Sequence, residues 1–86
     1  MKDLELTRVA VMSIIVEDLS SIEILNNILH EYREFIIGRM GLPYRVKKIN
    51  IICIALDAPQ DIISALSGRI GNLEGISVKT ITRHNK

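Results

Sequence analysis

Few residues in this chain of 86 carry side chains suited to acid–base, nucleophilic or metal chemistry. There is one cysteine, Cys53, and the two histidines, His30 and His84, are far apart in the sequence. Cys53 lies in an apolar run, residues 49–56, where a thiol is expected to act as a small hydrophobe rather than as a nucleophile. One thiol cannot form an intrachain disulfide, a zinc site or an iron–sulfur cluster. We therefore predict no catalytic residue and no metal site within one chain, and the sequence identifies no cofactor.

His30 can be interpreted in two ways, as a solvated surface residue or as a functional one. On a helical wheel it lies opposite the apolar stripe of its predicted helix, beside Asn26 and Asn27. This position fits a solvated helix face. It also fits a ligand or metal contact at a subunit interface, because neutral imidazole binds metals and titrates near neutrality. A metal site would need symmetry mates or a carboxylate such as Glu31.

A glycine-containing segment, residues 38–44 (GRMGLPY), is the second candidate. Gly38 and Gly41 interrupt a predicted strand, which indicates either a bulge or sheet edge, or close approach of a ligand or partner strand. No helix follows, so the segment lacks the context of a phosphate-binding loop. Arg39 supplies a charged fork for an anion, and Tyr44 supplies a polar tip. The predicted ligand or interface residues are His30, Gly38, Arg39, Met40, Gly41 and Tyr44.

Hydrophobic periodicity predicts the elements that position these residues within a single domain spanning the chain. Strands are expected at about residues 7–16, 35–44, 49–56 and 76–82, and helices at about 20–33 and 58–70. Ser20 and Glu23 form a capping-box pattern at the first helix. Asp57 is predicted to cap the second helix, with Pro59 in its first turn and Gln60 at the box position.

The order βαββαβ predicts an α+β, ferredoxin-like sandwich with both helices on one face. Right-handed crossovers place strands 7–16 and 49–56 at the centre of an antiparallel sheet of order 4-1-3-2. Both strands are apolar on both faces, as central strands are. Two helices cover only one face of such a sheet, and the other would expose an apolar patch rare on soluble monomers. We therefore expect a homo-oligomer, dimer or tetramer, that buries the open sheet face or an edge strand.

Composition narrows the class of partner. The net charge is +1, and only 3% of the residues are aromatic, none of them on the predicted central strands, which argues against direct nucleic-acid binding. The longest stretch rich in apolar residues, Val9 to Val16, is too short to cross a bilayer, and the N-terminus has no hydrophobic signal core. A single thiol fits a reducing compartment. We expect a cytoplasmic protein without membrane contact.

Several segments resemble one family of small proteins. These are residues 29–32 (LHEY), 36–44 (IIGRMGLPY), 57–68 (DAPQDIISALSG) and 75–79 (GISVK). Together they resemble regulators of the iron-only hydrogenase system, over about residues 8–79. The resemblance implies an ACT-like domain, also similar to the sensing domain of nickel-responsive repressors, that acts in anaerobes as a regulator rather than a catalyst.

The chain departs from both related folds at their binding residues. ACT domains usually place glycine in the first strand–helix turn, and residues 16–20 (VEDLS) contain none, which argues against amino-acid binding in that manner. Nickel-responsive repressors carry several metal-binding histidines and a DNA-binding ribbon. Here His30 and Cys53 are isolated, and about six residues precede the first strand.

The resemblance therefore implies a non-enzymatic regulatory or sensor protein, acting on transcription or through protein contact. It would bind a small effector or a partner protein at an oligomer interface. Two alternatives stay open. One is a structural or interaction module without a ligand of its own, and the other is an amino-acid-binding ACT regulatory domain.

Overall fold

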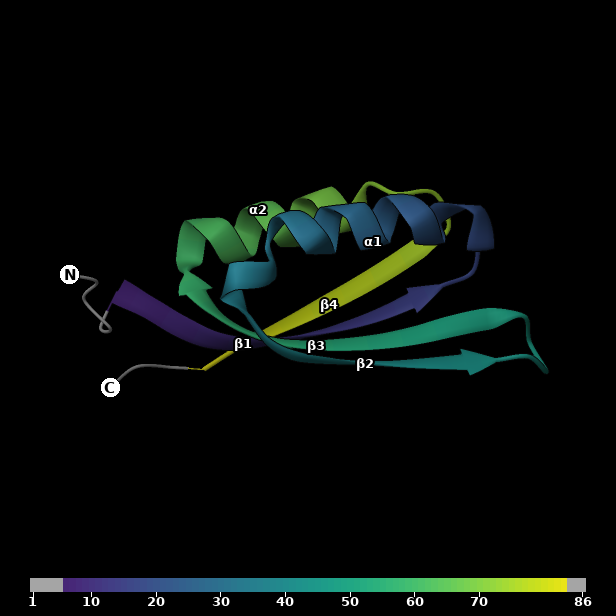
Figure 1. The fold of residues 1–86 in the computed structure, drawn as a ribbon, viewed down its shortest axis with the longest axis horizontal. Helices are drawn as coiled ribbons and strands as arrows, with labels where there is room; N and C mark the ends of the chain where they lie inside the picture. The colour runs from purple at the N-terminus through teal and green to yellow at the C-terminus, as the bar shows by residue number, and fades with distance from the viewer. Residues whose placement is uncertain (1–5, 84–86) are drawn as a thin grey trace.

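A four-stranded antiparallel sheet lies beneath two helices in the computed structural model, which describes residues 6–83 (Figure 1). The strands are β1 (Thr7–Val16), β2 (Ile36–Tyr44), β3 (Ile49–Pro59) and β4 (Ile76–Thr82), and the helices are α1 (Ile22–Glu31) and α2 (Gln60–Gly71). Short 3-10 turns, Leu19–Ser21 and Arg33–Phe35, flank α1. The strand order β2-β3-β1-β4 confirms the predicted ferredoxin-like topology, with β1 and β3 at the centre.

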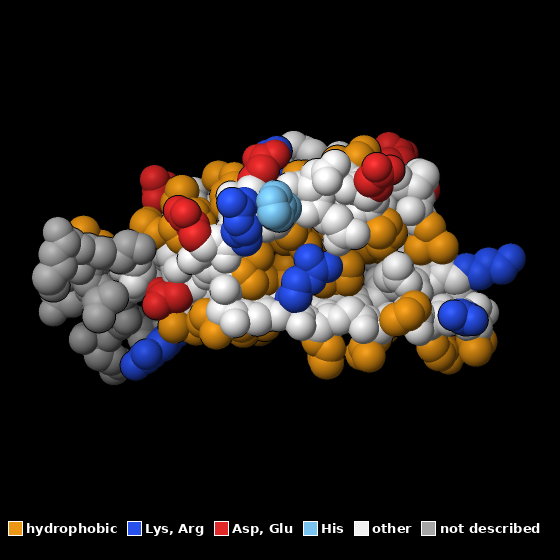
Figure 2. Space-filling view, viewed as in Figure 1, with side chains coloured by type: hydrophobic (Ala, Val, Ile, Leu, Met, Phe, Trp, Pro, Cys, Tyr) orange, Lys and Arg blue, Asp and Glu red, His pale blue; other side chains and the backbone are white. Residues whose placement is uncertain are grey.

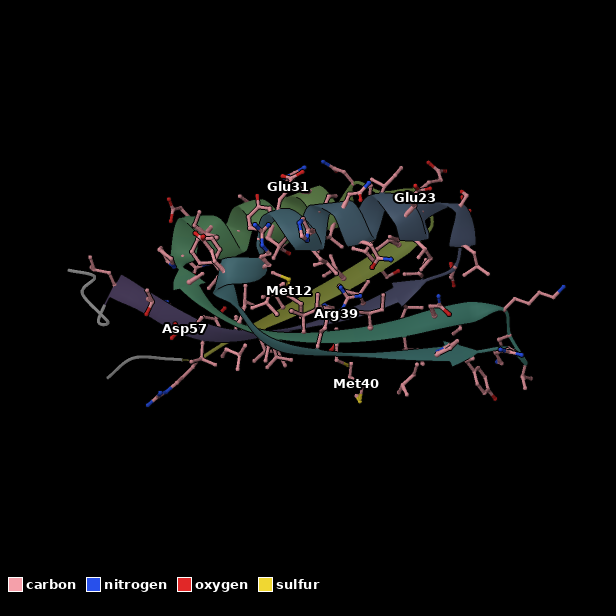
Figure 3. All side chains as sticks on the ribbon, viewed as in Figure 1. Met12, Glu23, Glu31, Arg39, Met40 and Asp57 are labelled. Carbon is pink, nitrogen blue, oxygen red and sulfur yellow. The ribbon has the colours of Figure 1, made fainter. Side chains whose placement is uncertain are left out.

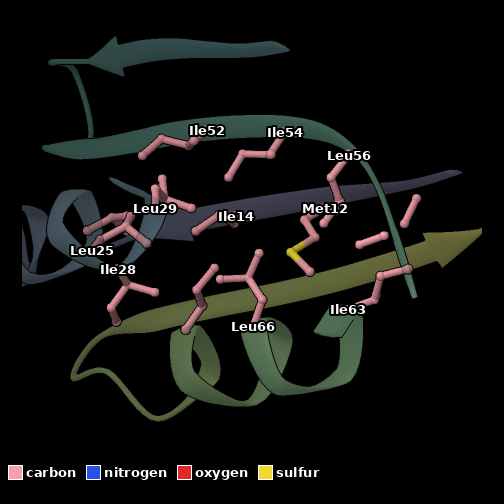
Figure 4. Close-up of a cluster of buried hydrophobic side chains, with 14 residues drawn as sticks. Met12, Ile14, Leu25, Ile28, Leu29, Ile52, Ile54, Leu56, Ile63 and Leu66 are labelled. Carbon is pink, nitrogen blue, oxygen red and sulfur yellow. The ribbon is translucent and has the colours of Figure 1, made fainter. Parts of the chain in front are cut away.

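The core lies between the helices and one face of the sheet (Figure 4). Alternate residues of β1 and β3 point into it, because successive side chains on a strand face opposite sides. The helices contribute residues at helical spacing. The core side chains from the two central strands are Ala10, Met12, Ile14, Val16, Ile52, Ile54, Leu56 and Ala58, and those from the helices are Leu25, Ile28, Leu29, Ile63, Leu66 and Ile70.

The start of α1 differs from the predicted capping box. The side chain of Asp18 accepts hydrogen bonds from the backbone N–H and the hydroxyl of Ser20, at 3.0 and 2.6 Å. Ser21 is the residue before α1, but its hydroxyl donates to the carbonyl oxygen of Glu74, at 2.8 Å, rather than capping the helix. The predicted box of Ser20 and Glu23 is therefore wrong, because Asp18 already supplies the acceptor two residues earlier.

The start of α2 also differs. Asp57 lies opposite Val9 in the ladder between β1 and β3, and that ladder continues until Pro59 lies opposite Thr7. Asp57 is thus a strand residue, and the prediction that it caps α2 is wrong. Pro59 precedes the helix instead, with no side-chain cap, because pairing with the long β1 extends β3 beyond residue 56.

β2 is an edge strand, as its glycines and proline indicated. Its register with β3 shifts between Ile36 and Gly38, so Ile37 forms a bulge. Every residue from Ile37 to Tyr44 is exposed. Phe35, expected to open this strand, belongs to the 3-10 turn before it.

Within residues 6–83, none of the helices is long and apolar enough to cross a membrane.

Candidate functional site

The six residues predicted as one site lie on two opposite faces of the sheet. Arg39 and Gly41 of β2 lie opposite Ile54 and Ile52 of β3, whose side chains are buried beneath the helices. Both therefore face the helical layer. Figure 3 shows Arg39 directed from β2 toward α1, and Met40 directed away from the helices. One edge strand thus presents two surfaces of different chemistry.

The surface on the helical side is a groove between α1 and β2, called here the α1–β2 groove. One end is a pocket of about 270 Å³ lined by Asn26, Leu29, His30, Arg33, Ile36 and Arg39. The other end is a pocket of about 210 Å³ that shares Asn26 and Arg39 with the first, and whose lining includes Ile22, Gly41, Pro43, Asn50 and Ile52. The structure therefore brings His30, Arg39 and Gly41 to one groove.

Among residues 6–83, one hydrogen bond between side chains crosses this groove. Nη2 of Arg39 donates to Oδ1 of Asn26, at 3.1 Å. Nη1 of Arg33 donates to the carbonyl oxygen of His30, at 2.9 Å, which places a second guanidinium beside the imidazole. Among the described residues, neither arginine forms an ion pair. The groove therefore combines cationic side chains with polar tips on α1.

The second surface is the face of the sheet that no helix covers, called here the open face. It is largely apolar, and its outward-facing side chains lie along the lower side in Figures 2 and 3. Met40 and Leu42 are about half exposed, at 52% and 49%, and Val11 and Ile15 are each 42% exposed. Other open-face members are Val9, Ser13, Gly38, Tyr44, Ile49, Ile51, Cys53, Ala55, Asp57, Ser77, Lys79 and Ile81.

The open face is hollowed beside Met40. The hollow measures about 320 Å³ and lies between Val11 and Met40, with Gly38, Cys53 and Ala55 among its lining residues. Small residues at adjacent positions on β2 and β3 create it, since Gly38 and Ala55 lie opposite one another in the ladder. A protruding methionine and a recess therefore lie side by side on one surface.

Gly38 and Gly41 are not required by the fold of a single chain. A Cβ atom added at either position would meet nothing within 4 Å. Gly75 is the one glycine with positive φ among the described residues, so neither Gly38 nor Gly41 needs the left-handed region. The space above each is open, at Gly41 into the α1–β2 groove and at Gly38 into the hollow of the open face.

The turn between β1 and α1 is closed by the turn that precedes β4. The backbone N–H of Glu17 donates to the carbonyl oxygen of Gly75, at 2.7 Å. A Cβ added at Gly75 would lie 2.5 Å from Cβ of Asp18, so the two turns are in close contact. The hydrogen bonds from Ser20 lower the pKa of the Asp18 carboxyl. This turn is therefore occupied by the protein's own backbone.

Electrostatic pairing on the outer surface joins the two helices. Nη1 of Arg69 on α2 lies 2.8 Å from Oε1 of Glu31 on α1, and its guanidinium lies 5.7 Å from the ring centre of Tyr32. The hydrogen bond from Arg69, and then its charge, lowers the pKa of Glu31, and the same hydrogen bond raises the pKa of Arg69. Glu31, considered above as a metal-ligand partner of His30, is thus engaged by arginine.

In the part of the chain that the structure describes, no three His, Cys, Asp or Glu side chains come close enough together to hold a metal ion. Cys53 is half-buried on the open face rather than in the core, next to Ser13 and Met40 in the sheet. His84 lies outside the described residues.

Two groove residues, Asn26 and Arg33, were not among the predicted site residues. The signal for them was present in the helical spacing, because Asn26, His30 and Arg33 are separated by four and three residues and so follow one line of the helix. What the sequence did not reveal is that β2 lies close to this side of the helix, so that Arg39 reaches Asn26.

Comparisons with known proteins agree on the fold and on the family. A family model described as "TM1266-like: Iron-only hydrogenase system regulator, putative" matches residues 8–80. No curated protein matches the chain significantly. Protein TM1266 from Thermotoga maritima has a similar solved structure, with a TM-score of 0.85 and 34% sequence identity, over 88% of this chain and 96% of that one.

A more distant likeness shows the fold alone. A formyltetrahydrofolate deformylase from Pseudomonas putida KT2440 matches 85% of this chain with a TM-score of 0.60 and 13% identity, and the match spans 28% of that enzyme. The family model covers most of the chain, and the sequence identity to TM1266 is 34%, so both comparisons establish family membership. The chain belongs to the TM1266-like family, described as regulators of the iron-only hydrogenase system.

Proposed function

We propose that this protein is a non-enzymatic regulator that works as a homodimer, with the open face buried between two copies and a small effector bound in the α1–β2 groove. The family description supports the regulatory role. The observation that carries the proposal is the open face itself, because a contiguous apolar surface of this kind is rare on a soluble monomer.

The open face is large enough for a stable dimer. The strands β1, β2, β3 and β4 have 10, 9, 11 and 7 residues. At a rise of about 3.3 Å per residue and a strand spacing of about 4.8 Å, the four-stranded face has a flat area of roughly 600 Å². A standard protein interface buries about 800 Å² on each partner. Side chains that protrude from the sheet add to the flat area, so burial of this one face supplies an interface of standard size.

The shape of the open face suits a second copy. In a two-fold dimer the same patch meets itself, so a protrusion must find a recess on that same patch. Met40 and the hollow at Gly38 are such a pair. The register of the described strands places one cationic side chain, Lys79, and one acidic side chain, Asp57, on this face. Arg83 follows β4 at the margin, where its backbone N–H donates to the carbonyl oxygen of Val9. The charges are few for the size of the face.

The groove supports an effector more than a reaction. Acid–base or nucleophilic catalysis needs a pair of reacting groups that face one another. None of the described residues lining the groove is a carboxylate or a thiol beside His30. Amino-acid binding at the β1–α1 turn is not part of the proposal, since that turn packs against Gly75.

Native mass spectrometry and light scattering test the dimer. Met40→Glu places a charge on the open face, and Ile24→Glu is the matched control, because each side chain is 52% exposed and Ile24 lies on α1. We expect the wild type and Ile24→Glu to be dimers and Met40→Glu to dissociate while it keeps its circular dichroism spectrum. A monomeric wild type, or a Met40→Glu variant as dimeric as the control, would contradict the proposal.

A further inference from the structure

The cationic end of the α1–β2 groove has more donors than the protein uses. An arginine carries five N–H donors. Arg39 donates one of them to Asn26, and Arg33 donates from Nη1 to the carbonyl oxygen of His30. None of the described residues that line this pocket is acidic. Two guanidinium groups and an imidazole therefore meet in one pocket with no counter-charge from the residues that form it.

Apolar side chains form part of the lining throughout the groove. Leu29 and Ile36 line the cationic pocket beneath the polar groups. Ile22, Pro43 and Ile52 line the neighbouring pocket, with Asn50. In Figure 2 one Lys or Arg side chain lies over apolar ones between the helical layer and the edge of the sheet, and Figure 3 shows Arg39 in this place. A groove with positive charge at one end and apolar side chains along its floor is complementary to an amphiphilic ligand.

The hydrogen bond between Arg39 and Asn26 separates the two pockets, since both residues line each of them. Small-molecule sites measure about 300 to 1,000 Å³, so neither pocket alone is large enough for more than a small group. A carboxylate or phosphate oxygen is a stronger acceptor for guanidinium than a neutral amide oxygen, because it carries the opposite charge and its group can accept two parallel N–H bonds from one guanidinium. An anion therefore competes well with Asn26 for Arg39, and its arrival joins the two pockets.

We propose that the α1–β2 groove binds a small organic anion, with its carboxylate or phosphate head held by Arg39, Arg33 and His30 and its apolar body along Ile22, Pro43 and Ile52. This inference rests on the proposed function for its biological meaning, because it names the chemical class of the effector. The binding itself needs only the one chain, since every residue invoked belongs to α1, the turn after it, β2 or β3.

Titration calorimetry and amide NMR test the site with four probes. 3-Phenylpropionate and phenylphosphate carry the two head groups, 3-phenylpropionamide is the neutral analogue, and inorganic phosphate lacks the apolar body. We expect at least one of the two phenyl anions to bind at least tenfold more tightly than both the neutral analogue and inorganic phosphate. The tighter of the two identifies the head group. The shifted amides should lie in α1 and β2.

Three variants locate the binding. Arg39→Gln removes the proposed anion ligand and should weaken binding at least tenfold. Arg45→Gln makes the same charge change in the β2–β3 turn, away from the groove, and should change the affinity less than twofold. Gly41→Val leaves the charge intact but fills the pocket proposed for the apolar body of the ligand, and should also weaken binding at least tenfold.

Equal losses in Arg39→Gln and Arg45→Gln would show general charge attraction and overturn the proposal. Equal affinity for the anions and the amide would overturn it too, and so would affinity for inorganic phosphate equal to that for phenylphosphate. The Met40→Glu variant separates this proposal from the dimer. If it is monomeric and still binds, the site is complete in one chain. If the wild type binds but is itself monomeric, the dimer fails and the anion site stands.

Discussion

Arg39 on the edge strand and Asn26 on the first helix are joined by a hydrogen bond of 3.1 Å between their side chains, which links β2 to α1. On the opposite side of the same strand, Met40 protrudes from the open face. Neighbouring residues of one strand thus belong to two surfaces, one cationic and grooved, the other apolar. A ligand that draws Arg39 from Asn26 acts on the strand that carries Met40, which offers a physical route from effector to assembly.

Gly75→Ala should destabilise the protein strongly. Gly75 has φ of 68°, which costs a residue with a Cβ about 1–2 kcal/mol. The added Cβ would also lie 2.5 Å from Cβ of Asp18 and 2.8 Å from its backbone nitrogen, so the two turns must move apart. We expect the free energy of unfolding to fall by more than about 2 kcal/mol, measured by urea denaturation at one fixed protein concentration.

Gly68→Ala is the matched control for that variant. Gly68 lies within α2, and a Cβ there meets nothing within 4 Å. Alanine in a helix is more stable than glycine by about 0.5–1 kcal/mol, so this variant should be more stable than the wild type. An equal loss in both variants would show that any added methyl group is harmful and that the contact with Asp18 is not the cause.

The sequence predicted the strand order, the central pair and the single covered face, because two doubly apolar strands admit few arrangements. It misplaced both helix starts, for different reasons. Ser20 donates its hydroxyl to Asp18, a nearby acceptor that the capping-box pattern overlooked. Asp57 pairs with Val9, a distant partner about which local patterns contain no information.

The predicted site residues could be chosen from their types, but the sequence did not divide them between the groove and the open face. The residue types selected Arg39 and Met40 together, as one segment. Their separation onto two faces follows from strand periodicity, and the edge position of β2 decides which face carries the groove. Asn26 was missed because its helical spacing from His30 places it on the same line of α1 but does not show that Arg39 of β2 reaches it.

Glu31→Gln should lower stability at neutral pH and have no effect in acid. The hydrogen bond from Arg69, and then its charge, lowers the pKa of Glu31 in the folded protein below its ordinary range. A carboxyl with a depressed folded pKa stabilises the protein fully above its unfolded pKa, and this stabilisation is lost as the pH falls through the folded pKa. The melting temperature of the variant should therefore be lower than that of the wild type at pH 7 and equal to it well below pH 4.5.

Thermal melts of both proteins at a series of pH values measure this difference. Glu34→Gln controls for the removal of one negative charge, since Glu34 forms no ion pair with a described residue. The side chains of Glu31 and Arg69 are about half exposed, so the effect should be small. A melting difference for Glu31→Gln that persists unchanged at pH 3 would exclude the ion pair as its source.

Cys53 should report burial of the open face. Its side chain is half-buried in the single chain and lies at the centre of that face, beside Met40. In a dimer through the open face a thiol reagent reaches it only after dissociation, so alkylation should slow as the protein concentration rises. Met40→Glu should react faster, by tenfold or more, at a rate independent of concentration. The rate is followed by intact mass.

Ile24→Glu serves again as the control for thiol reactivity. Ile24 lies on α1, away from the open face, and its substitution should leave the alkylation rate within twofold of the wild type. A rate for the wild type that does not change over a hundredfold range of protein concentration would mean that the open face is not covered by a second copy.

The same substitution at two positions of one strand should separate assembly from effector binding. Gly38→Val and Gly41→Val each add a side chain where nothing lies within 4 Å of the new Cβ, and valine is favoured in strands. Both variants should fold, with free energies of unfolding of the isolated chain within about 1 kcal/mol of the wild type or higher. Gly38→Val fills the hollow of the open face and should weaken the dimer at least tenfold while anion binding is retained. Gly41→Val fills the α1–β2 groove and should show the reverse pattern, and two variants with the same pattern would mean that the faces of β2 do not have separate roles.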